Sequence, residues 1–265
     1  TCTNAITAKQ LSRRWNTGID KAKKTLQVTT QRGTRTVQFP SLEARFWTND
    51  QQLCYRRLKT ALYTDTMFAS TVSTRGNACA QIFVNDIEWV RAFPMARKGD
   101  AHTCLDLLFP EEGVPNIMIM DDAKELVSGE FRKKCRRAGC YSKTLEPYSP
   151  WMNRAKGTIR ELKRATRRAM VKSGSPKRLW DYCLELHSKI RSNVAHDITT
   201  LGGQTPETLM SGDTADISSL CEFEWFQWVL YRDEKAGYPD EAKEPGSYTH
   251  LRAHETVLDL VCRLL

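Results

Sequence analysis

The sequence lacks a long hydrophobic run. No apolar stretch in its 265 residues approaches the ~18 residues that suggest a membrane-spanning helix, and no signal peptide opens the chain. We therefore expect no membrane partner. With 40% hydrophobic and 27% charged residues, the composition indicates a soluble, globular protein and not a disordered one. Because the first residue is Thr1 and not Met, we expect the chain to be a fragment of a longer product.

Cysteine and histidine are present, but they do not form a metal-binding motif. None of the nine cysteines forms a C-x-x-C pair, and the closest two, Cys135 and Cys140, have no His or second Cys pair near them. His250 and His254 are the one His pair with ligand spacing. We predict no zinc, and we expect reduced thiols in an intracellular protein.

Charge of one sign is in excess. Forty Lys and Arg residues stand against 31 Asp and Glu residues, which gives a formal net charge of +9. Such an excess favours a polyanionic partner, either nucleic acid or an acidic membrane surface. The alternative is a basic surface without a partner, and the choice depends on whether the charges cluster.

The last residues, 247–265, resemble a sequence from outside the protein. They spell SYTHLRAHETVLDLVCRLL, which resembles the conceptual translation of a sequencing-library adapter with a variable index at Val257 and Leu258. An amphipathic C-terminal helix is the alternative, because the apolar residues have helical spacing. We exclude this segment from functional reasoning. Its charges cancel, so the excess of +9 belongs to the residues before it.

Periodicity and turn signals outline the order of elements. Helices are expected at 6–15, 19–28, 101–109, 128–138, 151–172 and 176–195, and more weakly over 43–60. Strands are expected within 62–70, 78–86, 87–95, 115–120 and 139–146, with extended pieces around Gly33 and strands in the aromatic run 221–233. Asp100 is the expected N-cap of the helix at 101–109, with Pro110 beyond its end.

This order predicts an α/β fold. Three strands joined by tight turns form an antiparallel meander, and two later strands alternate with helices. The arrangement fits a ribonuclease-H-like core, a mixed five-stranded sheet flanked by helices, with a small N-terminal helical extension and a C-terminal strand-rich extension. Order alone also suits other α/β folds. We divide the chain into an N-terminal segment, a core, a C-terminal extension and the adapter-like tail, at 1–58, 59–200, 201–246 and 247–265.

Two aspartates lie where a sheet places ligand sites. Asp65 is in the middle of an otherwise partly apolar strand, where burial without a partner is costly. Asp121 and Asp122 end a short apolar strand, at the end where α/β sheets bind ligands. If the two strands are neighbours, Asp65 and Asp121 can share Mg²⁺ or Mn²⁺. Taken singly, Asp65 could instead be a turn or edge residue and Asp121 a helix cap.

Five stretches together resemble one family. They are 11–36, 63–86 with YTDT, 117–126 with IMIMDDAKEL, 146–170 with EPYSPWMNRAKG, and 176–185 with PKRLWDYCLE. The chain resembles the integrase core of copia-type retrotransposons (Pseudoviridae-like), most specifically the divergent copia-like elements of diatoms and other algae. The resemblance extends from about residue 7 to residue 235.

The resemblance implies an activity and a metal site. Integrases of this kind belong to a Gag-Pol polyprotein and join element cDNA to target DNA by metal-dependent phosphoryl transfer. Three carboxylates hold two metal ions, which lie ~3.5–4 Å apart. Carried onto this sequence, the first ligand is Asp65 and the second is Asp121. Glu125 keeps the Glu of the family's D-N-G-x-E-F motif, whereas Asp122, Ala123 and Leu126 depart from it.

Lysine stands at the third ligand position. Relatives have Glu where this chain has Lys156, at the expected separation of 156 − 121 = 35 positions from Asp121. A protonated Lys donates and does not accept, so it cannot bind the metal. Glu161 is no substitute, because it lies about 140° around the helix and about 7.5 Å along it. Lys156 is either a lesion in a decaying element or a residue that contacts phosphate.

The helix that carries Lys156 is strongly basic. Its candidate DNA contacts are Arg154, Lys156, Arg160, Lys163, Arg164 and Arg167. Such a face favours binding to DNA phosphates without base recognition, and the alternative is a solvated helix face. An N-terminal zinc unit of the kind that often precedes integrase cores is not expected, because no His precedes His102.

Three functional hypotheses remain open at this point. The first is an integrase that processes and joins cDNA ends, impaired by Lys156. The second is a catalytically dead remnant that still binds DNA, and the third is a nuclease or transposase with the same fold. The expected partners are DNA and further copies of the chain, and the expected location is intracellular, nuclear when the protein acts on chromosomal DNA.

Overall fold

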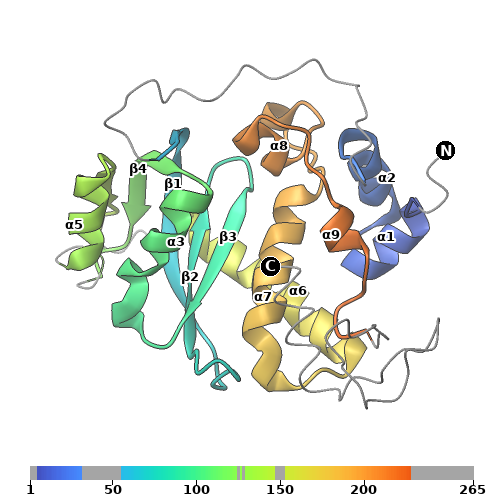
Figure 1. Cartoon of the computed structure of the whole chain (residues 1–265), viewed down its shortest axis with the longest axis horizontal. Helices are drawn as coiled ribbons and strands as arrows, with labels where there is room; N and C mark the ends of the chain where they lie inside the picture. Colours follow the sequence, from blue (N-terminus) through green and yellow to red (C-terminus); the bar gives the residue numbers. More distant parts are fainter. Residues whose placement is uncertain (1–4, 32–54, 124–125, 127–128, 147–152, 228–265) are drawn as a thin grey trace, which may run out of the picture.

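A computed structural model of the chain describes residues 5–31, 55–123, 126, 129–146 and 153–227 (Figure 1). The predicted turn at Gly33, the motif residue Glu125 and the adapter-like tail lie outside the described residues, as do residues 43–54 of the weakly predicted helix.

A mixed five-stranded sheet forms the centre of the fold. Its strand order is β3-β2-β1-β4-β5, with β2 antiparallel to its neighbours β1 and β3, and β4 and β5 parallel to β1. The strands are β1 (Arg57–Phe68), β2 (Cys79–Val84), β3 (Val90–Met95), β4 (Val114–Met120) and β5 (Tyr141–Thr144). The predicted α/β class, with a meander beside parallel strands, is confirmed.

The strand β1 is longer than the sequence predicts. Residues 57–60, which we expected to be helical, form the beginning of β1. They are extended because Arg57 and Leu58 pair with Val114 and Pro115 of β4. Leu58 and Leu62 are both buried in the core of the sheet. Tertiary pairing therefore decides the conformation of a segment whose local pattern is ambiguous.

Helices cover both faces of the sheet (Figure 1). On one face, α3 (Cys104–Glu111) and α5 (Glu130–Arg137) bury Leu105, Leu108 and Phe131 against Leu62 and Met118. On the other face, α6 (Arg154–Ser173) and α7 (Trp180–Asn193) pack on β2 and β3, with the short 3₁₀ helix η3 (Lys177–Leu179) between them. The helices of the two faces enclose two separate apolar cores.

The long helix α6 has the apolar stripe that its spacing predicts. Ala155, Leu162 and Ala169 are buried, and Ile159 and Ala165 are partly buried. Asn153 caps the helix at its N-terminus, and Gly174 ends it in the left-handed conformation with φ of 68°. The stripe faces the sheet, so the charged residues between these positions are left on the outside.

The segment around Asp100 differs from its prediction. Asp100 lies within a 3₁₀ helix, η1 (Lys98–His102), and its carboxylate accepts a hydrogen bond from the backbone N–H of Arg97. It therefore does not cap α3, which begins at Cys104. Pro110 lies inside the last turn of α3 and not beyond it. The helix ends one residue later, so few backbone hydrogen bonds are lost to the proline ring.

Two short helices precede the core, as predicted. Thr7 and Gln10 form a capping box at the start of α1 (Ala8–Trp15), and α2 (Ile19–Val28) follows after the left-handed Asn16. Both helices pack against α7, on the side away from the sheet (Figure 1). They therefore bury the outer side of α7.

The C-terminal extension is helical over the part that the structure describes. It contains η4 (Thr199–Leu201), α8 (Pro206–Ser211) and α9 (Ser218–Cys221). The prediction of strands is wrong for residues 221–227, which follow α9 without strand pairing. Trp225 is buried there, and its Nε1 donates to Ser175 Oγ at 2.9 Å. Trp225 thus attaches an irregular segment to the helical core. The remaining residues of the predicted strands, 228–233, lie outside the described residues.

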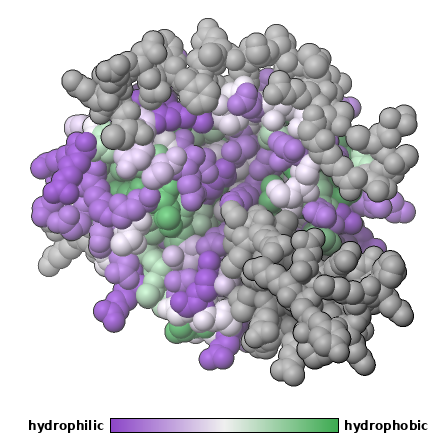
Figure 2. Space-filling view, in the orientation of Figure 1, coloured by the Kyte–Doolittle hydropathy of each residue, from purple (hydrophilic) through white to green (hydrophobic). Residues whose placement is uncertain are grey.

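Hydrophilic side chains cover much of the coloured part of the face in Figure 2. Figure 2 shows hydrophilic residues over α5, whose Lys133, Arg136 and Arg137 are exposed. None of the helices in the described ranges is long and apolar enough to cross a membrane.

Candidate active site

Asp65 and Asp121 come from neighbouring parallel strands. Thr64 of β1 lies opposite Met120 of β4, so the residue after each of them, Asp65 and Asp121, stands at the same edge of the sheet. The condition that the sequence left open, adjacency of the first and fourth strands, is therefore met. The carboxyl ends of parallel strands are the usual place for a ligand site in an α/β sheet.

A polar network holds β1 in place around Asp65. The buried Thr64 donates from Oγ1 to the carbonyl of Ile82 at 2.9 Å and accepts from Gln81 Nε2 at 2.6 Å. Gln81 Oε1 in turn accepts from Thr66 Oγ1 at 2.8 Å. These side chains join β1 to β2 on both sides of Asp65. Its position is consequently set by the sheet and not by a loop.

Burial raises the pKa of Asp65 above its usual value, and the negative charge of Asp121 adds to this effect. The hydrogen bond from the Thr66 backbone N–H and the charges of Lys156 and Lys98 act in the opposite direction, without cancelling it. The charges of Lys156 and Lys98 thus do not offset the cost of burying Asp65 in its ionised form. The sequence did not single out Lys98, which the chain brings near from η1.

Lys156 lies in the first turn of α6 and contacts Asp121. The Lys156 Nζ atom is 2.7 Å from Asp121 Oδ2, and the two side chains are 39% and 31% exposed. The residue at the position that the resemblance predicts as the third ligand therefore contacts Asp121, and its charge acts on Asp65. It arrives as a cation that forms an ion pair, and not as a third carboxylate.

Asn153 is a site residue that the sequence analysis did not assign. Its side-chain oxygen accepts from the backbone N–H of Ala155 at 3.1 Å, as an N-cap. Its Nδ2 donates to Asp121 Oδ1 at 3.1 Å and to the carbonyl of Thr64 at 3.4 Å. Asn153 is 2% exposed. The preference for Asn at helix starts could have indicated the cap, but not the contact with Asp121.

The described residues do not fit the two-metal site that the resemblance implies. Both carboxylate oxygens of Asp121 already have partners, Asn153 and Lys156, and one oxygen of Asp65 accepts from Thr66 N–H at 2.8 Å. Among the residues that the structure describes, no group of three or more His, Cys, Asp or Glu could hold a metal ion. Two divalent ions need several converging carboxylates.

The other acidic residues nearby do not complete the site. Asp122 is exposed, and Glu125 lies outside the described residues. Glu161 is exposed and accepts from Arg164 Nη1 at 2.9 Å on the outer side of α6. As helical spacing predicts, Glu161 therefore lies on a different side of α6 from Lys156 and does not take part in the site.

The predicted DNA contacts of α6 divide into two groups. The first group has partners within the protein. Arg154 donates to the backbone carbonyl of Asp86, Lys156 forms an ion pair with Asp121, and Arg164 forms an ion pair with Glu161. The second group consists of exposed residues for which no ion pair is found within the described ranges: Arg160, Lys163 and Arg167. Within the described part of the chain, this second group is therefore the one whose charge is not used in an ion pair.

Comparison with known proteins gives matches in structure alone. No protein-family model matches the sequence, and no curated protein matches it either. The catalytic core domain of BIV integrase is similar with 15% identity and a TM-score of 0.44, over 57% of this chain and 92% of that one. The HTLV-2 integrase catalytic core domain in complex with magnesium, in a trimeric form, is similar with 13% identity and a TM-score of 0.44, over 58% and 97%. This identity is too low to transfer the role of any residue.

Proposed function

We propose that this chain is the core of a copia-type retrotransposon integrase, built to join element cDNA to target DNA, in which Lys156 blocks the metal site. The observation that carries this proposal is the convergence of Asp65, Asp121 and position 156 from two strands and a helix. The three positions are far apart in the sequence, and the resemblance assigns the three metal ligands to these same positions.

The side chain at position 156 decides what the site can do. In-line displacement at a phosphodiester requires charge compensation on the attacking and leaving oxygens, which two divalent ions supply in this class. Lys156 provides one positive charge, and this charge forms an ion pair with Asp121. The chain as written is therefore expected to be impaired in joining.

A catalytically dead DNA-binding remnant is the second candidate function, and the Lys156–Asp121 ion pair favours it. Binding would use the free cations of α6, whose attraction to phosphates needs no metal. Under either function the proposed partner is DNA, as element ends and target. We also propose a homo-oligomer, with an intracellular location that is nuclear when the protein acts on chromosomal DNA.

A DNA-joining assay with Mg²⁺ or Mn²⁺ separates the two functions. We expect no measurable strand transfer by the unchanged protein, and a gain of metal-dependent joining in Lys156→Glu. Lys156→Gln is the matched control, because it removes the ion pair without adding a carboxylate. Adding Asp65→Asn to Lys156→Glu should abolish the gained activity.

Two results would contradict the proposal, the first against a block by Lys156 and the second against integrase activity. Substantial metal-dependent joining by the unchanged protein, lost in Asp65→Asn, would show that Lys156 does not block the site. DNA binding without any joining by Lys156→Glu, in a protein that remains folded, would instead support the DNA-binding remnant.

A further inference from the structure

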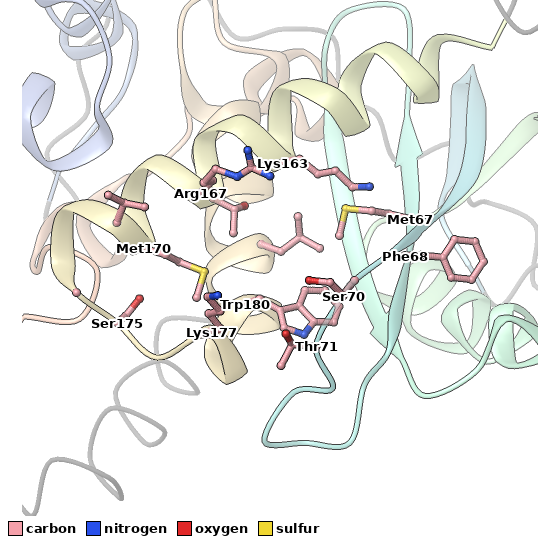
Figure 3. A pocket seen from close by; sticks show the side chains of 15 residues that line it. Met67, Phe68, Ser70, Thr71, Lys163, Arg167, Met170, Ser175, Lys177 and Trp180 are labelled. Atoms are coloured by element: carbon pink, nitrogen blue, oxygen red, sulfur yellow. The ribbon is translucent and has the colours of Figure 1, made fainter.

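A cavity of about 720 Å³ lies next to the candidate active site, between the end of β1 and the helices α6 and α7 (Figure 3). Met67, two residues after Asp65, lines it from β1. Lys163 and Arg167 line it from α6. At ~1.5 Å per residue, Lys163 is about 10 Å along α6 from Lys156. The cavity is therefore within one or two nucleotides of the two aspartates.

The cavity combines apolar walls with a positively charged rim. Its apolar side chains include Met67, Met170, Leu184 and the ring of Trp180, and its charged side chains are Lys163, Arg167 and Lys177. None of the described residues that line it is acidic. Figure 3 shows Lys163 and Arg167 extending from α6 and Trp180 near Ser70 and Thr71, whereas Phe68 points away.

The three cations are exposed, and no ion pair is found for them within the part of the chain that the structure describes. Among the described residues, nothing thus competes with an outside anion for their charge. Two polar atoms of the wall, Trp180 Nε1 and Thr166 Oγ1, are buried without a hydrogen-bond partner among the described residues. These two atoms are themselves buried behind the cavity surface, so the charged rim and the apolar side chains are what the cavity presents to a ligand.

These features specify the chemistry of a ligand. A site without carboxylates does not suit a metal ion or a cationic peptide. Apolar and aromatic walls suit a flat, poorly charged ring, and cations at the rim suit phosphates attached to it. A cavity of this size lies in the range that encloses small ligands, ~300–1,000 Å³. A base within a duplex is stacked and paired, so the base that enters must be unpaired.

We propose that this cavity binds an unpaired nucleotide of a DNA strand, with its base against Trp180, Met67 and Met170 and its phosphates on Lys163, Arg167 and Lys177. The inference rests on the proposed function, because the strand that supplies the nucleotide is the DNA that lies along α6. Lys163 and Arg167 belong both to the basic face of α6 and to the cavity. The cavity thus continues the DNA surface and adds a preference for DNA with a single-stranded end.

Fluorescence anisotropy with labelled duplexes tests the preference. One duplex is blunt and the other carries a two-thymidine overhang, both with the same paired sequence and at the same salt concentration. We expect the overhang to bind about 5- to 100-fold more tightly, the range that stacking of a base on an aromatic side chain supplies. An overhang with abasic sites keeps the phosphates and should lose most of this gain.

Neighbouring residues on α6 provide a matched control. Arg167→Gln and Lys163→Gln should reduce the preference for the overhang at least severalfold. Arg168→Gln removes the same charge from an exposed residue that does not line the cavity, so it should keep the preference. Equal loss of preference in Arg167→Gln and Arg168→Gln would overturn the proposal, since the helix charge alone would then explain binding.

Photo-crosslinking locates the base without altering the protein. With 5-iododeoxyuridine in the overhang, we expect adducts on peptides that contain Trp180, Met67 or Met170. Adducts exclusively elsewhere would overturn the assignment to this cavity. Salt-sensitive binding of both duplexes with no preference would refute the cavity but leave the proposed function intact. Failure to bind either duplex would refute both.

Discussion

Lys156 and Asp121 form an ion pair with 2.7 Å between Nζ and Oδ2, on a carboxylate whose other oxygen accepts from Asn153. Because both side chains are about one-third exposed, solvent screens the pair, and its contribution to stability is small. Its effect on the charge of the site is larger, because the ammonium contacts Asp121 and its charge also acts on Asp65 to lower the pKa of that carboxyl. Substitutions at position 156 are therefore expected to change function without unfolding the protein.

Lys156→Glu should create Mg²⁺ binding that is independent of any activity. A third carboxylate beside Asp65 and Asp121 completes a hard oxygen site. We expect Mg²⁺ at a tenfold excess over its Kd to raise the Tm of this variant by about 3–6 °C. Calorimetry with and without the ion measures the shift. The unchanged protein and Lys156→Gln should show no such shift. An equal rise in Tm in all three proteins would contradict the proposal that Lys156 prevents metal binding at this site.

The affinity for blunt duplex DNA should depend steeply on salt. Each phosphate contact contributes about 0.9 to the slope of log K against log salt concentration. Arg160→Gln, which removes an exposed charge from α6, should lower that slope by about one. Arg136→Gln on α5 is the control, because α5 covers the opposite face of the sheet. A similar decrease in both variants would place DNA elsewhere than on α6.

Asp181 should be a major contributor to stability. It is fully buried, and its Oδ2 accepts from Arg75 Nε at 2.8 Å and from Asn77 Nδ2 at 2.9 Å. Asp181→Ala leaves these donors unpaired and should lower the free energy of unfolding by about 3 kcal/mol. Glu185→Ala, which removes the second acid beside Arg75, should cost about 1 kcal/mol because Asp181 remains. Denaturant unfolding compares the two, and the reverse order of losses would be inconsistent with this network.

Acid should destabilise the fold through His187. Burial lowers the pKa of His187 to about 4, and the Nε2 atom has no partner among the described residues. The unfolded chain takes up a proton at about pH 6.5, whereas the folded chain does so near pH 4. Stability is therefore full above pH 6.5 and falls by about 3 kcal/mol as the pH decreases to 4.

His187→Gln isolates this effect. Burial also raises the pKa of Glu112 and Glu185, which act in the opposite direction, but they are present in both proteins. The difference in unfolding free energy between the variant and the unchanged protein should thus change with pH only through His187. A difference that stays constant from pH 7 to pH 4 would show that His187 is not buried in the neutral form.

Much of the local structure could be predicted from the sequence. The two N-terminal helices begin and end close to the expected residues, because Thr7, Asn16 and the apolar spacing are local signals. The buried stripe of α6 was equally readable. Where such signals were weak, the prediction was wrong: residues 57–60 joined β1, and the aromatic residues after α9 did not form strands within the described chain.

The sequence by itself determined which residues stand at the site, namely Asp65, Asp121 and a lysine at position 156, because strand order and spacing along the chain follow from local pattern and from the resemblance. The tertiary structure alone decided how they meet. The ion pair of Lys156 with Asp121, the double role of Asn153 and the cavity lined by Trp180 join residues from separate elements. Such contacts depend on how helices pack on a twisted sheet, and this packing has no signature within any single segment.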